Sequence, residues 1–156
     1  MHHAFRTLSL LTLCLALAAC DDPFILAAGG ELSGTVENPP ATWQFDEDSG
    51  FAQLETRPED PYSINLTYVQ LDGNLYAYAG NTRTNWVEHI EQHALVRIRV
   101  DETIYPTRAV RVTDRGELTK FAAKWSGRDP MQFDEVWLYR LEARRPTTER
   151  PNSPAD

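Results

Sequence analysis

The sequence predicts a mainly β protein of the α+β class, in which mostly antiparallel strands form a small barrel closed by two short helices. Three observations lead to this prediction. Several segments alternate apolar and polar residues with the two-residue period of a half-buried strand. Helical spacing occurs only in two short stretches, so the chain lacks the regular βαβ alternation of a doubly wound sheet. Closure removes exposed strand edges, which favours a barrel for such a chain.

The strongest strand prediction is a hairpin in the middle of the chain. Residues 62–68 alternate strictly, and Asp72-Gly73, a pair that tolerates the positive φ of a tight turn, leads into a partner strand at residues 75–79. Pro106 cannot donate a ladder hydrogen bond, so it indicates an edge position or a bulge. Further strands are expected at residues 31–37, 51–57, 95–100, 103–112 and 135–143, the last with apolar side chains on both faces and therefore inside the sheet.

Two short helices are predicted from their capping residues. Asn85 is expected to N-cap the first helix and Glu88 to close a capping box, and Asp114 and Glu117 are expected to do the same for the second. The element order is then β-β-β-β-α-β-β-α-β. The apolar faces are Trp86, Val87 and Ile90 in the first helix and Leu118, Phe121, Ala122 and Trp125 in the second, which Ser126-Gly127 should end.

Residues 1–19 have the character of a secretory signal peptide. Arg6 precedes an apolar run that is too short for a relaxed bilayer span. The run ends in a Leu-Ala-Ala-Cys sequence that resembles the bacterial lipobox, which implies that Cys20 carries lipid and anchors an exported protein facing the periplasm or the cell exterior. The alternative is a plain secretory signal with a cysteine nearby. Asp21 and Asp22 resemble an inner-membrane retention signal, and the choice of membrane stays open.

Composition sets the domain boundaries and excludes several classes of partner. Residues 20–30 are expected to be a tether, residues 31–145 the folded domain, and the Pro-, Thr- and Ser-rich residues 146–156 a disordered tail. With 15 Lys and Arg against 23 Asp and Glu, a net charge of −8 argues against nucleic acid as a partner. Cys14 and Cys20 are the only cysteines in the sequence, which excludes a disulfide-rich scaffold. Because the chain is acidic, the membrane contact is expected to be the lipid rather than a basic patch on the protein.

The predicted strand order and several motifs resemble the pyridoxamine-phosphate-oxidase-like split β-barrels, including their deazaflavin-dependent nitroreductase branch. The resemblance covers residues 51–145. It rests on the Leu-Glu-Thr strand at residues 54–56, the hairpin at residues 68–78, the loop at residues 80–86 and the closing strand at residues 137–142. It implies a split β-barrel with FMN, deazaflavin or occasionally haem in a cleft at a homodimer interface. It therefore allows a homodimer and a small-molecule ligand.

The family holds the cofactor phosphate in the loop before the first helix, in a pattern like T-N-x-x-S-x-K. Asn81 matches the Asn and Thr84 can replace the Ser, whereas Gly80 and Trp86 stand where the Thr and Lys would be. A Trp at that position is typical of the nitroreductase branch. Arg83 or Arg57 would have to supply the missing cation. The resemblance thus implies cofactor contacts from Asn81, Arg83, Thr84 and Trp86.

Other groups of side chains leave two interpretations open. His89 and His93 share a helix face, but two imidazoles without a third ligand favour a solvated face and no metal site. Seven aromatic residues either fill the barrel or line a pocket: Tyr62, Tyr68, Tyr76, Tyr78, Trp43, Trp125 and Trp137. Arg97, Arg99, Arg108 and Arg111 form either a ladder facing acidic residues or an anion site.

Two functional hypotheses from different classes follow. In the favoured one, the barrel is a non-catalytic module that binds a small ligand or another envelope protein, with no cofactor indicated by the residues themselves. The alternative is a flavin- or deazaflavin-dependent oxidoreductase, which the resemblance implies. No catalytic residue can be named from the sequence, because paired carboxylates and nucleophile motifs are missing from it.

Overall fold

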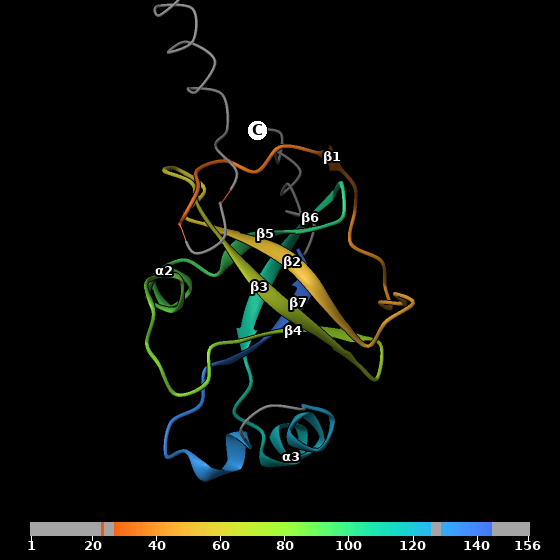
Figure 1. Ribbon diagram of the computed structural model, residues 1–156, viewed down its shortest axis with the longest axis vertical. Helices are drawn as coiled ribbons and strands as arrows, with labels where there is room; N and C mark the ends of the chain where they lie inside the picture. The colour runs from red at the N-terminus through yellow and green to blue at the C-terminus, as the bar shows by residue number, and fades with distance from the viewer. Residues whose placement is uncertain (1–22, 24–26, 126–128, 145–156) are drawn as a thin grey trace, which may run out of the picture.

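Strands dominate the computed structural model, which describes residues 23, 27–125 and 129–144 (Figure 1). The predicted signal peptide, the predicted lipidation site Cys20 and the predicted tail lie outside the described residues. Six strands of the described part form the barrel: β2 (Ser49–Thr56), β3 (Tyr62–Leu71), β4 (Asn74–Tyr78), β5 (Leu95–Val100), β6 (Thr103–Arg111) and β7 (Leu138–Ala143).

The barrel closes because each of these strands pairs with two others. The order β6-β5-β2-β3-β4-β7 runs antiparallel throughout, and an additional pairing of β6 with β7 completes the ring. A two-residue strand, β1 (Thr35–Val36), adds to β6 in parallel from outside the ring. The predicted mainly antiparallel barrel is confirmed. The predicted strand at residues 31–37 shrinks to β1, and the one at residues 135–143 begins only at Leu138.

Local turn chemistry explains the central hairpin. Asp72 and Gly73 have φ angles of 50° and 74°, the two positive values that a primed two-residue turn needs. The turn sets the register of β3 and β4, in which Leu71 pairs with Asn74. Pro106 pairs with β5 on one side, while its other side falls between the end of the β1 pairing and the start of the β7 pairing. Pro106 was expected at an edge position or a bulge; β6 is not an edge strand, and Pro106 lies at a local gap in the pairing on one side of it.

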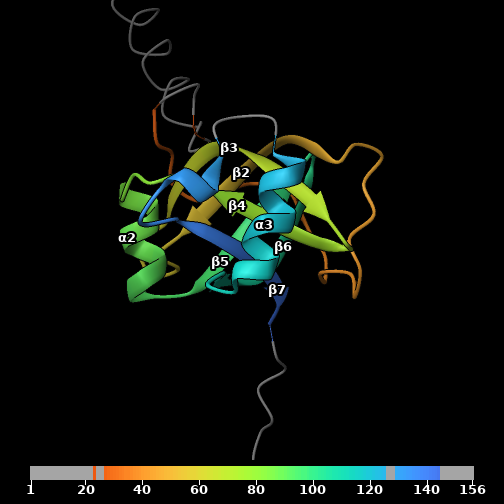
Figure 2. The ribbon, with the colours of Figure 1, turned by 90° about the horizontal axis from the view of Figure 1, so that it is seen from below.

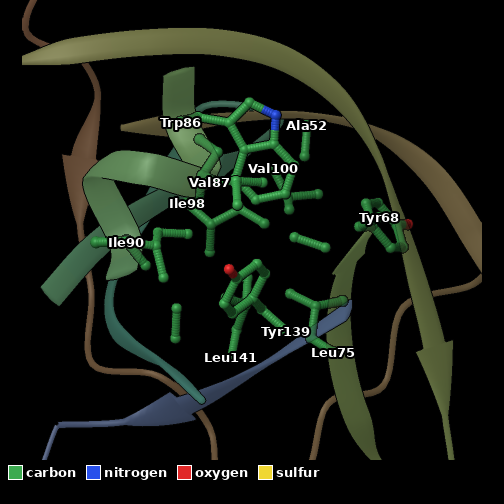
Figure 3. Close-up of a cluster of buried hydrophobic side chains, with 14 of the residues drawn as sticks. Ala52, Tyr68, Leu75, Trp86, Val87, Ile90, Ile98, Val100, Tyr139 and Leu141 are labelled. Carbon is green, nitrogen blue, oxygen red and sulfur yellow. The ribbon is translucent and has the colours of Figure 1, made fainter. Parts of the chain in front are cut away.

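Apolar side chains from all six strands fill the barrel. The helix α2 (Asn85–Gln92) lies at one end and adds Trp86, Val87 and Ile90 to this core. Figure 3 shows these three side chains pointing from the helix into the cluster that contains Tyr139 and Leu141. The interior is therefore a packed core.

The helix α3 (Arg115–Lys124) covers the outside of the barrel (Figure 2). Phe121 is fully buried there and packs in a second cluster with Val69, Tyr76, Val112 and Leu138. A short 3-10 helix, η1 (Pro130–Gln132), follows α3 and contacts it. The predicted stop at Ser126-Gly127 lies outside the described residues, and the last helical residue is Lys124.

The two predicted helix caps have different outcomes. Asp114 caps α3 as expected, with its carboxylate accepting a hydrogen bond of 2.8 Å from the backbone N–H of Glu117. The prediction of Asn85 as a cap is wrong, because Thr84 is the N-cap of α2 and Asn85 is already helical. Thr84 has an extended backbone and its carbonyl accepts from the Glu88 N–H, but its side chain makes no capping bond. Thr84 and Asn85 are both of residue types that favour the N-cap, so the sequence does not fix the first residue of α2.

Residues 27–37 cross the outer face of the barrel, and we call them the N-terminal strap. Gly29 forms an isolated antiparallel bridge with Ser63 of β3, and β1 at the far end of the strap pairs with β6. Between these points the Leu32 N–H donates to the Glu55 carboxylate at 2.7 Å. Gly29 lies within the predicted tether, so the part of the tether nearest the domain is hydrogen-bonded to the barrel.

No helix within the described ranges is both long and apolar enough to cross a membrane.

Candidate functional site

The loop predicted to hold a cofactor phosphate connects β4 to α2 and is tied to the segment before β7. Gly80 has a φ of 69°, which favours glycine, and its carbonyl accepts a hydrogen bond of 2.9 Å from the Trp137 N–H. The Ala79 N–H donates to the Trp137 carbonyl at the same distance. The start of the loop is thus held against the segment before β7 by two hydrogen bonds.

Two guanidinium groups lie over the indole ring of Trp137, which is 2% exposed. Arg111 from β6 lies 3.7 Å from the ring centroid and Arg83 from the loop lies 5.5 Å from it. Carboxylates accompany both cations: Glu88 lies 4.0 Å from Arg83 and Glu91 lies 3.8 Å from Arg111. The positive charge of this cluster is therefore largely compensated within the chain.

Trp86 belongs to the core and not to an open cleft. It is 8% exposed, and its ring lies edge-on to that of Tyr139 with the centroids 5.8 Å apart. The Tyr139 hydroxyl donates to the Glu91 carboxylate at 2.9 Å. Burial, followed by this hydrogen bond to Glu91, raises the pKa of Tyr139 well above its ordinary value. Trp86 thus covers a neutral, hydrogen-bonded phenol.

The other residues considered for the cofactor site differ from Trp86 in exposure and in their contacts. Asn81 is exposed in the loop. The Thr84 hydroxyl is buried, and no hydrogen-bond partner for it occurs among the described residues. Arg57 lies in the β2–β3 turn, where it pairs with Asp60 at 3.0 Å and lies over the ring of Tyr62.

Two of the predicted contacts offer little to a flavin phosphate. The position of the family's phosphate-binding Lys is occupied by Trp86, whose side chain is in the core. The loop also contains the cation Arg83. Its side chain is exposed, lies over Trp137 and is next to Glu88. A dianionic phosphate needs an uncompensated cation or several convergent donors, and Arg83, the cation of the loop, is already next to Glu88.

The two histidines of the α2 region, His89 within the helix and His93 at its C-cap, differ in burial. The His89 ring nitrogen Nδ1 lies 3.0 Å from the Thr56 hydroxyl, and the ring lies edge-on to Tyr62. Burial, and secondarily the charge of Arg57, lowers the pKa of His89 below its ordinary value. His93 is exposed at the end of the helix. Within the described residues no three side chains of metal-ligating type come together.

The arginines of β5 and β6 serve mainly to hold the N-terminal strap and neighbouring loops. Arg97 donates to both oxygens of Glu55, at 2.7 Å and 2.5 Å, and Glu55 is 4% exposed. Arg99 donates to the carbonyl of Ser33 in the strap at 2.5 Å. Arg108 is exposed. The interpretation as a ladder facing acidic residues therefore describes Arg97 best, although sequence reasoning did not single out its buried partner Glu55.

The seven aromatic residues act chiefly as packing. Trp43, Tyr68, Tyr76 and Trp137 are buried, and Tyr62, Tyr78 and Trp125 are half-buried against the same two clusters. Their contacts are with one another and with core residues; for example, the Phe121 and Trp125 rings stack with centroids 5.9 Å apart. The interpretation as barrel filling holds for most of them.

A hollow of about 640 Å³ lies beside the end of β5. The β2–β5 ladder contains three residue pairs and stops at Gln53–Arg99, because β5 ends one residue later at Val100 whereas β2 continues along β3 back to Ser49. The part of β2 before Gln53 and the turn that follows β5 both line this hollow. We call it the rim groove, and its lining consists of Gln44–Glu47, Ser49–Phe51, Gln53, Tyr68 and Arg99–Glu102.

The sequence carries signals of the rim groove, but they lie far apart in the chain. Asp46-Glu47 and Asp101-Glu102 are pairs of acidic residues, and Phe51 begins the strand predicted at residues 51–57. Phe51 is 66% exposed, one of two large hydrophobic side chains exposed in the described part of the chain.

Comparison with known proteins adds no functional assignment. No protein-family model matches the chain, and the search of curated proteins finds no significant match.

Proposed function

We propose that this protein is an exported lipoprotein, anchored through Cys20, whose barrel is a non-catalytic module that binds a small ligand or another envelope protein. In this proposal the lipid holds the module at a membrane, on the periplasmic or outer side, and the barrel has the architecture of the flavin-type split barrels. The anchoring is supported by the lipobox-like sequence that ends at Cys20.

The non-catalytic role is supported by the packing of the loop at residues 80–86, which the resemblance assigns to a cofactor phosphate. Trp86 is a core side chain, and Arg83 lies over Trp137 beside Glu88. Residues that are occupied in this way hold the loop against β7 and α2, and they leave the phosphate of a flavin without a dedicated cation. The filled barrel interior moves any ligand site to the outer surface or the rim.

Cofactor titration tests this role. We expect the purified protein to be colourless and to remain without a bound ~450 nm flavin band after FMN is added and unbound FMN is removed. Stoichiometric retention of FMN by the wild type, lost in Arg83→Ala, would instead establish the oxidoreductase alternative. Arg83→Ala is a clean probe because the side chain is exposed and its removal should leave the core intact.

Metabolic labelling tests the anchor separately. We expect cells to incorporate labelled palmitate into the wild type and not into Cys20→Ser. Equal labelling of both proteins would overturn the lipoprotein half of the proposal and leave the binding module untouched. Cys14→Ser is the matched control, because it removes the other cysteine of the chain and should leave labelling unchanged.

A further inference from the structure

The rim groove combines an acidic edge with an aromatic floor. Asp46 and Glu47 come from the loop before β2, and Asp101 and Glu102 form the turn between β5 and β6. All four carboxylates are exposed, and none of them forms an ion pair with a cation in the described ranges. Arg99 is the sole cationic residue of the lining, so the groove carries a formal excess of negative charge.

The acidic residues of both loops line the same hollow as Tyr68. Burial raises the pKa of Tyr68, and smaller contributions in the same direction come from Asp101, Glu47 and Asp46. The two loops therefore add negative charge to one shared hollow.

The floor of the groove is held in shape by specific contacts. Tyr68 and Phe45 pack with ring centroids 5.0 Å apart. The Gln70 side chain accepts from the Phe45 N–H at 2.7 Å, which fixes the loop that carries Asp46 and Glu47. A Cβ at Gly50 would lie 2.8 Å from the Tyr68 ring, so a larger residue there would force the ring to shift. A preorganised groove loses little conformational entropy when it binds a ligand.

An unsatisfied polar atom in the lining indicates the kind of ligand. Gln53 is 6% exposed, and its amide nitrogen donates to Asn65 at 3.1 Å. Its carbonyl oxygen Oε1 has no hydrogen-bond partner within the described structure. A buried acceptor without a donor costs free energy, which a ligand that brings an N–H group would recover. The acceptor, the carboxylates and the aromatic rings all favour a cationic donor.

We propose that the rim groove binds an organic cation, an ammonium or guanidinium group carried on an alkyl chain. The cation lies among the four carboxylates, its N–H groups reach the Gln53 carbonyl, and its alkyl chain packs on exposed Phe51. The groove lacks the three convergent ligating side chains that a metal site needs, among the residues described. This assignment gives a ligand class to the proposed binding module and rests on that function.

Titration calorimetry on the lipidated protein in a non-ionic detergent tests the proposal with two probes. Spermidine represents a free polyamine, and a blocked Gly-Arg-Gly peptide represents a basic side chain of a protein partner. We expect at least one probe to bind and its binding to be lost when NaCl is raised from about 50 mM to about 500 mM, because exposed charges are screened. The probe that binds more tightly identifies the source of the cation.

Groove variants locate the binding. Glu47→Gln combined with Asp101→Asn should weaken it on the order of tenfold, and Phe51→Ala should weaken it about two- to fivefold. All three side chains are exposed, so the fold should be retained. Glu59→Gln, an exposed carboxylate in the β2–β3 turn, is the control for charge loss alone and should leave the affinity nearly unchanged.

The proposal is overturned if neither probe binds the wild type at about 1 mM, or if the groove variants weaken binding no more than Glu59→Gln does. These failures are distinct from failure of the proposed function. Retention of FMN would favour the oxidoreductase alternative over the non-catalytic module. A positive cation titration would still show a cation site in the rim groove. A negative cation titration with no FMN retention would leave the module with its ligand elsewhere.

Discussion

Replacing Trp86 by Ala is the most direct test of how the predicted cofactor loop is used. The indole is 8% exposed and packs against Tyr139 beside Val87 and Ile90. A buried Trp removes about 150–250 Å² from water, worth roughly 4–6 kcal/mol at ~25 cal/mol per Å² as an upper value. Because Ala retains part of this burial, the expected loss in the free energy of unfolding is about 3–5 kcal/mol.

Thermal unfolding followed by circular dichroism gives the readout. For a domain of this length each kcal/mol lowers the midpoint by about 3–5 °C, so Trp86→Ala should lower it on the order of 10–20 °C. Trp86→Phe should recover much of the loss by keeping an aromatic ring next to Tyr139. Arg83→Ala is the control from the same loop and should change the midpoint little, because its side chain is exposed. A shift of Trp86→Ala within about 2 °C would refute the core role and return Trp86 to a ligand cleft.

Three further predictions concern stability and pH. Glu55→Ala leaves Arg97 without its buried partner and should lower the urea midpoint by the equivalent of about 2–3 kcal/mol; an unchanged midpoint would show that the pair is dispensable. The pKa of His89 is lower in the folded protein than in the unfolded chain, so the unfolded chain binds more protons below about pH 6.5. The free energy of unfolding should therefore fall from about pH 7 to about pH 5, and it should fall less in His89→Gln. Equal pH dependence in the two proteins would contradict this. Asp114→Ala should cost about 1 kcal/mol through the lost cap, whereas Thr84→Ala, which removes no capping bond, should cost less in the same melts.

Features that depend on neighbouring residues were predictable from the sequence. The central hairpin follows from the alternation in residues 62–68 and from the positive φ of Asp72 and Gly73. The cap of α3 follows from Asp114 in the same way. The start of α2 was misplaced by one residue, because Thr84 and Asn85 both favour the cap position and no local rule ranks them.

The role of the candidate site residues depended on distant parts of the chain. Trp86 could be assigned to a core or a cleft only once Tyr139 of β7 was placed against it. Arg97 became a structural side chain because Glu55 lies on the neighbouring strand and is buried by the N-terminal strap. Neither partner is close in sequence, so spacing and periodicity contain no information about these contacts.

The class of the fold, the approximate strands and helices and the negative charge can all be predicted from this sequence, because they depend on composition or on short-range periodicity. The prediction of a lipid anchor depends on a short local motif that ends at Cys20. The tertiary structure adds that β5 ends beside β2 in such a way that two acidic segments line one hollow with Tyr68 and Phe45. A strand's pattern specifies which face is buried, whereas the place where a strand ends beside its partner depends on the closure of the whole barrel.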